Sequence, residues 1–138
     1  MSSEDKFEYW LIEMDHALAD FLAQLPPELS DRLNYTSQSL DELEGWLMRR
    51  YANIDEMNPQ EIALIVDGAA RYIGESFRRV LGGRWFIDSS DEDNAYHGLP
   101  QLGGCRNQTS QICPLKMVTA AVGRRTGNFS RTILENHL

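Results

Sequence analysis

The stretch from Asn58 to Trp85 constrains the fold most, because it combines the longest helical repeat of apolar residues with clear start and end signals. Asn58 is a good N-cap, Pro59 suits the first helical position, and Glu61 stands three residues after the cap, where it can bond back to it. The Gly82–Gly83 pair can adopt the left-handed conformation that closes a helix. We therefore predict one helix over this stretch, followed directly by a strand.

Two glycines interrupt the interior of this predicted helix. Gly68 and Gly74 each cost roughly 0.5 to 1 kcal/mol of helix propensity relative to alanine, so something in the fold should compensate for them. Either another element of the chain crosses the helix closely there, or a ligand or partner approaches its backbone. The second alternative makes the side chains beside these glycines, with an aromatic wall after the helix, candidates for a site. The candidate binding residues are Tyr72, Glu75, Arg78, Trp85 and Tyr96.

Charges of alternating sign follow one side of the same helix. Asp67, Arg71, Glu75 and Arg79 stand four residues apart, a spacing at which neighbours can form exposed ion pairs worth a few tenths of a kcal/mol. Arginines on both neighbouring turns favour the ionised form of Glu75. A carboxylate held in this way is a poor general base near neutral pH, so a structural ion pair is the simpler interpretation.

Two more helices are predicted before this stretch. Apolar residues recur at three- and four-residue steps from Asp5 to Gln24, and the Pro26–Pro27 pair ends the pattern. The opposite face of this first helix is acidic. A capping-box pattern predicts that a second helix runs from Ser39, as its N-cap, to about Ala52. Residues 1–83 are thus expected to form a three-helix unit.

The pattern changes from helical to extended after the glycine pair. Short β-prone runs predict a small antiparallel sheet, in which Pro100 moves the second strand toward an edge, and two short helices close the chain. We therefore predict a single α+β domain over residues 1–138. The predicted elements after residue 83 are strands at 84–88, 96–102 and 109–113 and helices at 114–123 and 129–138.

The charge of the chain is strongly acidic and unevenly distributed. The net charge is -8; residues 1–70 carry -11 and residues 71–138 carry +3. An acidic front half opposes binding to nucleic acid or anionic membrane, because phosphates need Lys and Arg. It favours a basic protein partner instead. The chain starts without a secretory signal pattern and has no run of about 20 apolar residues, so we expect a cytoplasmic protein.

Motifs for catalysis or cofactor binding are missing from the sequence. His16, His97 and His137 fall in three different predicted elements, and Cys105 and Cys113 are not in a C-x-x-C arrangement, so we expect neither a metal site nor a cofactor. In a reducing compartment the two cysteines are expected to be free thiols. No nucleophile elbow, Walker loop or dinucleotide fingerprint is present. These observations predict a protein that is not an enzyme.

The segment GAARYIGESFRRVLGGRW resembles a signature of small uncharacterised bacterial proteins, roughly Y-I/L-G-E-x-x-R-x-x-L-G-G-x-W. The matching positions run from Gly68 through Tyr72, Glu75 and Arg78 to Trp85, and SLDELEGWL at 39–47 is similar to a second stretch of the same proteins. The resemblance implies no activity. Some small acidic bacterial proteins of this build are immunity proteins that inhibit toxins, which is an analogy of size and charge.

Three hypotheses about function follow from the sequence. The leading one is a noncatalytic, acidic protein-interaction module, with an immunity-type inhibitor of a basic toxin as one form of it. The first alternative is a small-ligand binder or enzyme that uses the region of Gly74, Glu75 and Arg78, with Trp85 or Tyr96 as a wall. The second alternative is a homo-oligomeric structural protein; the sequence does not fix the oligomeric state.

Overall fold

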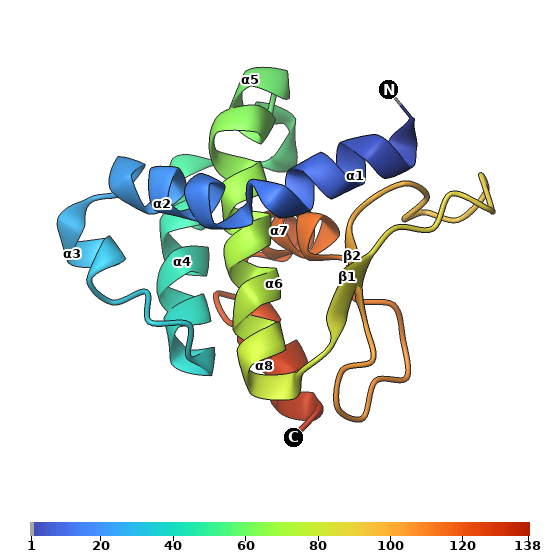
Figure 1. Cartoon of the computed structure of the whole chain (residues 1–138). Helices are drawn as coiled ribbons and strands as arrows, with labels where there is room; N and C mark the ends of the chain where they lie inside the picture. Colours follow the sequence, from blue (N-terminus) through green and yellow to red (C-terminus); the bar gives the residue numbers. More distant parts are fainter. Residues whose placement is uncertain (1) are drawn as a thin grey trace.

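The computed structural model describes residues 2–138 and confirms the α+β architecture, with helices around one central helix and a small antiparallel sheet at one side (Figure 1). The helices and strands are α1 (Ser3–Ile12), α2 (Met14–Gln24), α3 (Pro27–Ser30), α4 (Ser37–Arg50), η1 (Ile54–Glu56), α5 (Pro59–Glu61), η2 (Ile62–Val66), α6 (Asp67–Leu81), β1 (Arg84–Phe86), β2 (Gln101–Gly103), α7 (Pro114–Arg124) and α8 (Phe129–Asn136). In Figure 1, α1 and α2 cross in front of α6, and α7 lies behind it. No helix within residues 2–138 has both the length and the apolarity to cross a bilayer.

One apolar core connects the helical part with the sheet and the C-terminal helices. Phe77 of α6, Leu102 of β2, Val118 of α7 and Leu134 of α8 are all fully buried in it. Burying a side chain of this size stabilises a fold by about 1.5 to 3 kcal/mol. The core therefore supplies the main driving force that holds α6 at the centre of the molecule.

The N-cap and the glycine end signal of the central stretch are confirmed. The predicted return bond from Glu61 to the cap is not formed, because the Glu61 carboxylate accepts hydrogen bonds from Arg50 Nε and the Tyr51 hydroxyl instead. The side chain of Asn58 accepts a hydrogen bond from the Glu61 N–H at 2.9 Å, and Gly82 closes α6 with a φ of +74°. A turn of π-helix, η2, separates α5 from α6 and was not predicted. Its wider hydrogen-bond ring rotates the start of the helix relative to α6. As a result Ile62 is 42% exposed, although it stands three residues before the buried Ile65 in the apolar repeat.

Both interior glycines are explained by close packing within the chain. A Cβ at Gly68 would overlap the Phe21 side chain of α2, and a Cβ at Gly74 would overlap the ring of Trp85. Of the two interpretations of these glycines, the close approach of another element is thus confirmed at both positions. The helix propensity that each glycine costs is offset by the packing that it permits.

The first predicted helix is divided into α1 and α2 at Glu13, whose backbone has a ψ of 1°. The carbonyl oxygen of Trp10, in the last turn of α1, accepts a hydrogen bond from Arg71 Nη1 at 2.8 Å. This long-range bond competes with the helical hydrogen bonds at the bend. The position of the break was not predictable from the apolar repeat, which continues through it.

The cap of α4 was assigned to the wrong residue. α4 starts at Ser37, and the hydroxyl of Thr36 accepts the capping bond from the Ser39 N–H at 3.3 Å. The hydroxyl of Ser39 bonds instead to the Thr36 carbonyl oxygen and to the Tyr72 hydroxyl, at 2.7 and 2.6 Å. Two hydroxyl residues three positions apart can each cap a helix, and here a long-range contact decides between them.

The sheet is smaller than predicted. β1 and β2 pair antiparallel in the register Arg84 to Gly103, and the predicted third strand is reduced to one bridge between Leu102 and Ile112. The segment at 96–100 does not join the second strand, so Tyr96 lies in a turn. Pro100 has no N–H to donate, and Gly98 has a φ of +69°, which together prevent an extended ladder there.

Candidate functional site

The structure brings together three of the five predicted site residues at the end of α6. The carboxylate of Glu75 accepts hydrogen bonds from Arg78 Nη1, at 2.9 and 3.2 Å, and from Trp85 Nε1 at 2.8 Å. Arg78 Nε also donates to the Gly83 carbonyl oxygen at 3.2 Å. The Glu75 side chain is only 17% exposed. Its carboxylate thus fixes the Trp85 indole against α6 and ties the helix end to β1.

The alternating charges of α6 form one of the predicted ion pairs and otherwise make other partners. Asp67 and Arg71 form an ion pair at 2.8 Å, but Arg71 is buried, because its guanidinium lies 4.1 Å from the centroid of the Trp10 ring. Glu75 pairs with Arg78 rather than with the arginines four residues away. Arg79 stacks over the ring of Tyr35 at 3.6 Å. The pairs are therefore parts of aromatic clusters rather than isolated surface ion pairs.

Two tryptophans form the walls of a cleft of about 210 Å³ beside this cluster. Trp10 and Trp85 meet edge to face, with ring centroids 4.9 Å apart. Asp67 is the one acidic group in the lining, and its oxygens already accept bonds from Trp10 Nε1 and Arg71 Nε, both at 2.8 Å. The lining is otherwise apolar: Trp10, Ala70, Trp85, Pro100, Pro114 and Leu115.

Sequence reasoning identified only Trp85 among the residues of this cleft. The helical repeat places Trp10 in the apolar stripe of the first predicted helix, Pro100 marks the edge of a predicted strand, and Pro114 starts a predicted helix. Each assignment concerns local structure, whereas the cleft forms because four distant segments converge on α6. No spacing within one segment could have indicated it.

Tyr72 is not part of the Glu75 cluster. Its ring is fully buried and stacks on Tyr35 with centroids 4.7 Å apart. Its hydroxyl bonds to the Ser39 hydroxyl and accepts the Tyr35 N–H at 2.8 Å. Burial raises the pKa of the Tyr72 phenol above its ordinary value. The side chain therefore joins α6 to α4 and has no free surface for a ligand.

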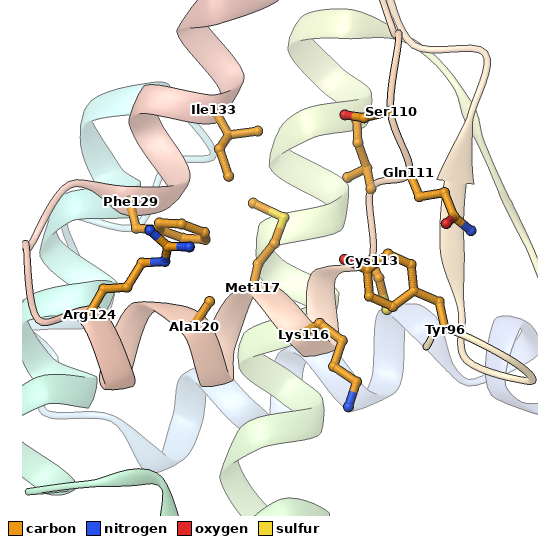
Figure 2. Close-up of a pocket in the computed structure, with 11 residues that line it drawn as sticks. Tyr96, Ser110, Gln111, Cys113, Lys116, Met117, Ala120, Arg124, Phe129 and Ile133 are labelled. Atoms are coloured by element: carbon orange, nitrogen blue, oxygen red, sulfur yellow. The ribbon is translucent and has the colours of Figure 1, made fainter. Parts of the chain in front are cut away.

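Tyr96 lies in a different place, at the edge of a pocket between α7, α8 and residues 110–113 (Figure 2). The main chain that carries it is a turn, and its ring lies near Cys113 in Figure 2. Tyr96 therefore cannot form a wall of the cleft beside Trp85. The five predicted residues divide among three separate environments.

The acidic face predicted for the first helix is present on α1 and α2. Tyr9 and Ile12, at 60% and 76% exposed, are the most exposed large apolar side chains of these two helices. Glu8 stands four residues before Ile12 and Glu13 four residues after Tyr9, and Asp15 follows the break in the first turn of α2. Among the described residues, no Lys or Arg nitrogen lies within 4 Å of these three carboxylates. None of the three therefore forms an ion pair with a lysine or an arginine.

Cysteine and metal chemistry find little support in the geometry. Cys105 and Cys113 are both buried free thiols, and burial raises the pKa of each thiol above its ordinary value. A raised thiol pKa lowers the fraction of reactive thiolate at neutral pH. In the part of the chain that the structure describes, no group of three or more His, Cys, Asp or Glu side chains is arranged to hold a metal ion.

Three comparisons with known proteins complete the description of the site. The resemblance of the α6 segment to small bacterial proteins stays a prediction, since none of the comparisons bears on it. No protein-family model, curated protein sequence or solved structure matches this chain.

Proposed function

We propose that this protein is a noncatalytic interaction module whose α1–α2 face binds a basic protein. The observation that carries the proposal is the placement of Tyr9 and Ile12 among carboxylates that lack a cationic partner. Exposed large apolar residues rimmed by charge are typical of interaction sites. Steering by the uncompensated charge would raise the rate of encounter with a basic surface.

A purely structural account explains part of this charge but not all of it. Glu4 and Asp5 lie in the first turn of α1, where carboxylates stabilise the positive end of the helix dipole. Glu13 and Asp15 lie at the N-cap and in the first turn of α2, where the dipole of that helix favours them in the same way. Glu8 lies beyond the first turn of α1 and gains nothing from either dipole. Glu8 stands three and four residues after Asp5 and Glu4, a spacing at which like charges destabilise a helix by a few tenths of a kcal/mol per pair. The proposed partner supplies the missing opposite charge, and a toxin inhibited by this protein is one such partner.

Reversing charge on this face is expected to abolish binding of the partner. The variant Glu8→Lys with Asp15→Lys should weaken binding by at least about tenfold, because two attractive interactions become repulsive. Ile12→Ser should weaken it without changing the charge. The measurement is recovery of the partner from a lysate of the organism that makes the protein, at low and at high salt, followed by titration of the purified pair.

A charge-matched variant separates this face from the net charge of the molecule. Glu92→Lys with Asp93→Lys changes the charge by the same amount in the exposed loop between β1 and β2, where neither side chain forms an ion pair. We expect it to retain the partner. If both double variants lose the partner equally, or if the complex is insensitive to salt, the proposed face is wrong.

The cleft beside Trp85 favours a second candidate function, the binding of a small uncharged aromatic molecule. Its apolar walls, with one polar group that is already bonded, suit such a ligand. Millimolar indole should shift the indole N–H resonances of Trp10 and Trp85 in an NMR titration. The Trp46 resonance is the internal control, because Trp46 lies on α4 outside the cleft. Equal shifts of all three signals, or none, would exclude this function.

A further inference from the structure

A pocket of about 270 Å³ lies between α7, α8 and the segment that precedes α7 (Figure 2). Its floor is apolar and buried, since Ile112 and Met117 are 3% and 6% exposed. Phe129 and Ile133 of α8 form a side wall, and the Met117 side chain points toward Ile133 in Figure 2. Ser110 places a hydroxyl at one edge. The pocket is therefore an apolar hollow with a polar rim.

The charges around this pocket are opposite in sign to those of the molecule as a whole. Lys116 and Arg124 line it, and its lining contains no Asp or Glu. Within residues 2–138, neither cation lies at ion-pair distance from a carboxylate. The net charge of the chain is -8, so a pocket lined by two cations and no carboxylate differs in sign from the molecule as a whole. They make the pocket attractive to an anion.

The two cations differ in how they face the apolar hollow. The Arg124 guanidinium lies over the Phe129 ring, 5.2 Å from its centroid, and Figure 2 shows it at the Phe129 side of the pocket. The Lys116 ammonium points away from Phe129 and Ile133 in the same view. Arg124 can present two parallel N–H donors to a carboxylate, which a lysine cannot. It is the better placed of the two for binding.

We propose that this pocket binds a small organic carboxylate that carries one aromatic ring or one branched apolar chain. Arg124 holds the carboxylate, and the apolar group lies on Met117 between Phe129 and Ile133. The volume lies below the range of roughly 300 to 1,000 Å³ that is usual for drug-sized ligands, which restricts the ligand to a small molecule. The site lies on α7 and α8, behind α6 in Figure 1, and does not depend on the protein partner proposed for α1 and α2.

Titration of the full chain with phenylacetate, followed by NMR, tests this proposal. Phenylacetate should shift the Met117 methyl resonance in a saturable manner, and 2-phenylethanol, which lacks the charge, should bind about tenfold more weakly because a charge-assisted bond is lost. The variant Arg124→Gln should weaken phenylacetate binding by about tenfold as well. Arg124 is exposed, so this change should leave the fold intact, which circular dichroism checks.

Lys116→Gln is the matched control, because it removes the same charge from the same pocket. We expect it to change the affinity for phenylacetate by less than about threefold, since its ammonium does not face the apolar group. Three results would overturn the proposal: no saturable shift of the Met117 methyl, equal affinity for phenylacetate and 2-phenylethanol, or equal losses in the two variants. The first two require only the wild-type protein and so do not depend on how the variants fold.

Discussion

Replacing Gly74 with alanine is expected to lower the free energy of unfolding by about 2 kcal/mol, although alanine is the better helix former. The added Cβ would overlap the ring of Trp85 and lie 3.2 Å from Pro114 Cγ. Moving Trp85 aside to make room would cost free energy, because its side chain is held by two contacts. Its Nε1–H is bonded to Glu75, and its ring meets the edge of Trp10. Denaturant unfolding of Gly74→Ala measures the loss, and the tryptophan emission should report a displaced indole.

Gly45→Ala provides the control for helix propensity. Gly45 lies in the interior of α4, and a Cβ there would meet only Arg49 Nη1, at an ordinary contact distance of 3.4 Å. This variant should therefore gain up to about 1 kcal/mol of stability. If Gly74→Ala were stabilising to the same extent, the inference that the Trp85 ring packs too closely on Gly74 of α6 to admit a Cβ would be wrong. The change in the free energy of unfolding is thus expected to have opposite signs in the two variants. The difference between them measures the effect of packing against Trp85, because the gain in helix propensity is common to both.

The sequence predicted the elements of this fold better than their contacts. Asn58 and Gly82 mark the ends of the central helix because caps are local: each depends on residues within one turn. The break at Glu13 and the choice of Thr36 over Ser39 depend on Arg71 and Tyr72, which are far away in the chain. Features set by a distant partner leave no periodic signal in the segment that they alter.

The candidate site shows the same division. Glu75, Arg78 and Trp85 were predicted together because they flank one helix end, and the structure places them in one hydrogen-bonded cluster. Tyr96 was grouped with them on the assumption of a long second strand. Once Gly98 and Pro100 end that strand, the ring lies at another pocket. The position of a loop residue depends on the path of the whole loop, which sequence patterns constrain weakly.

The attachment of the last helix depends on one buried carboxylate. Glu44 of α4 is 3% exposed, and its two oxygens accept the backbone N–H groups of Phe129 and Ser130 at 2.8 and 3.1 Å. These groups belong to the first turn of α8, where helix N–H groups lack partners within the helix and a negative charge is favourable. A side chain of α4 thus caps α8 across 85 residues of sequence.

Glu44→Ala is accordingly expected to lower the free energy of unfolding by about 3 kcal/mol, since it leaves one buried and one partly buried donor unbonded and opens a cavity beneath α8. Glu42→Ala removes the same charge two residues earlier in α4, where the side chain is exposed and its ion pair with Arg32 is long, at 3.5 Å. That control should change stability by less than about 0.5 kcal/mol.

Amide hydrogen exchange distinguishes capping from general destabilisation. In Glu44→Ala, the amides of Phe129 and Ser130 should lose protection under native conditions before those of α6, because α8 can detach while the core remains folded. Simultaneous loss throughout the chain would show that Glu44 supports the whole core rather than the start of α8.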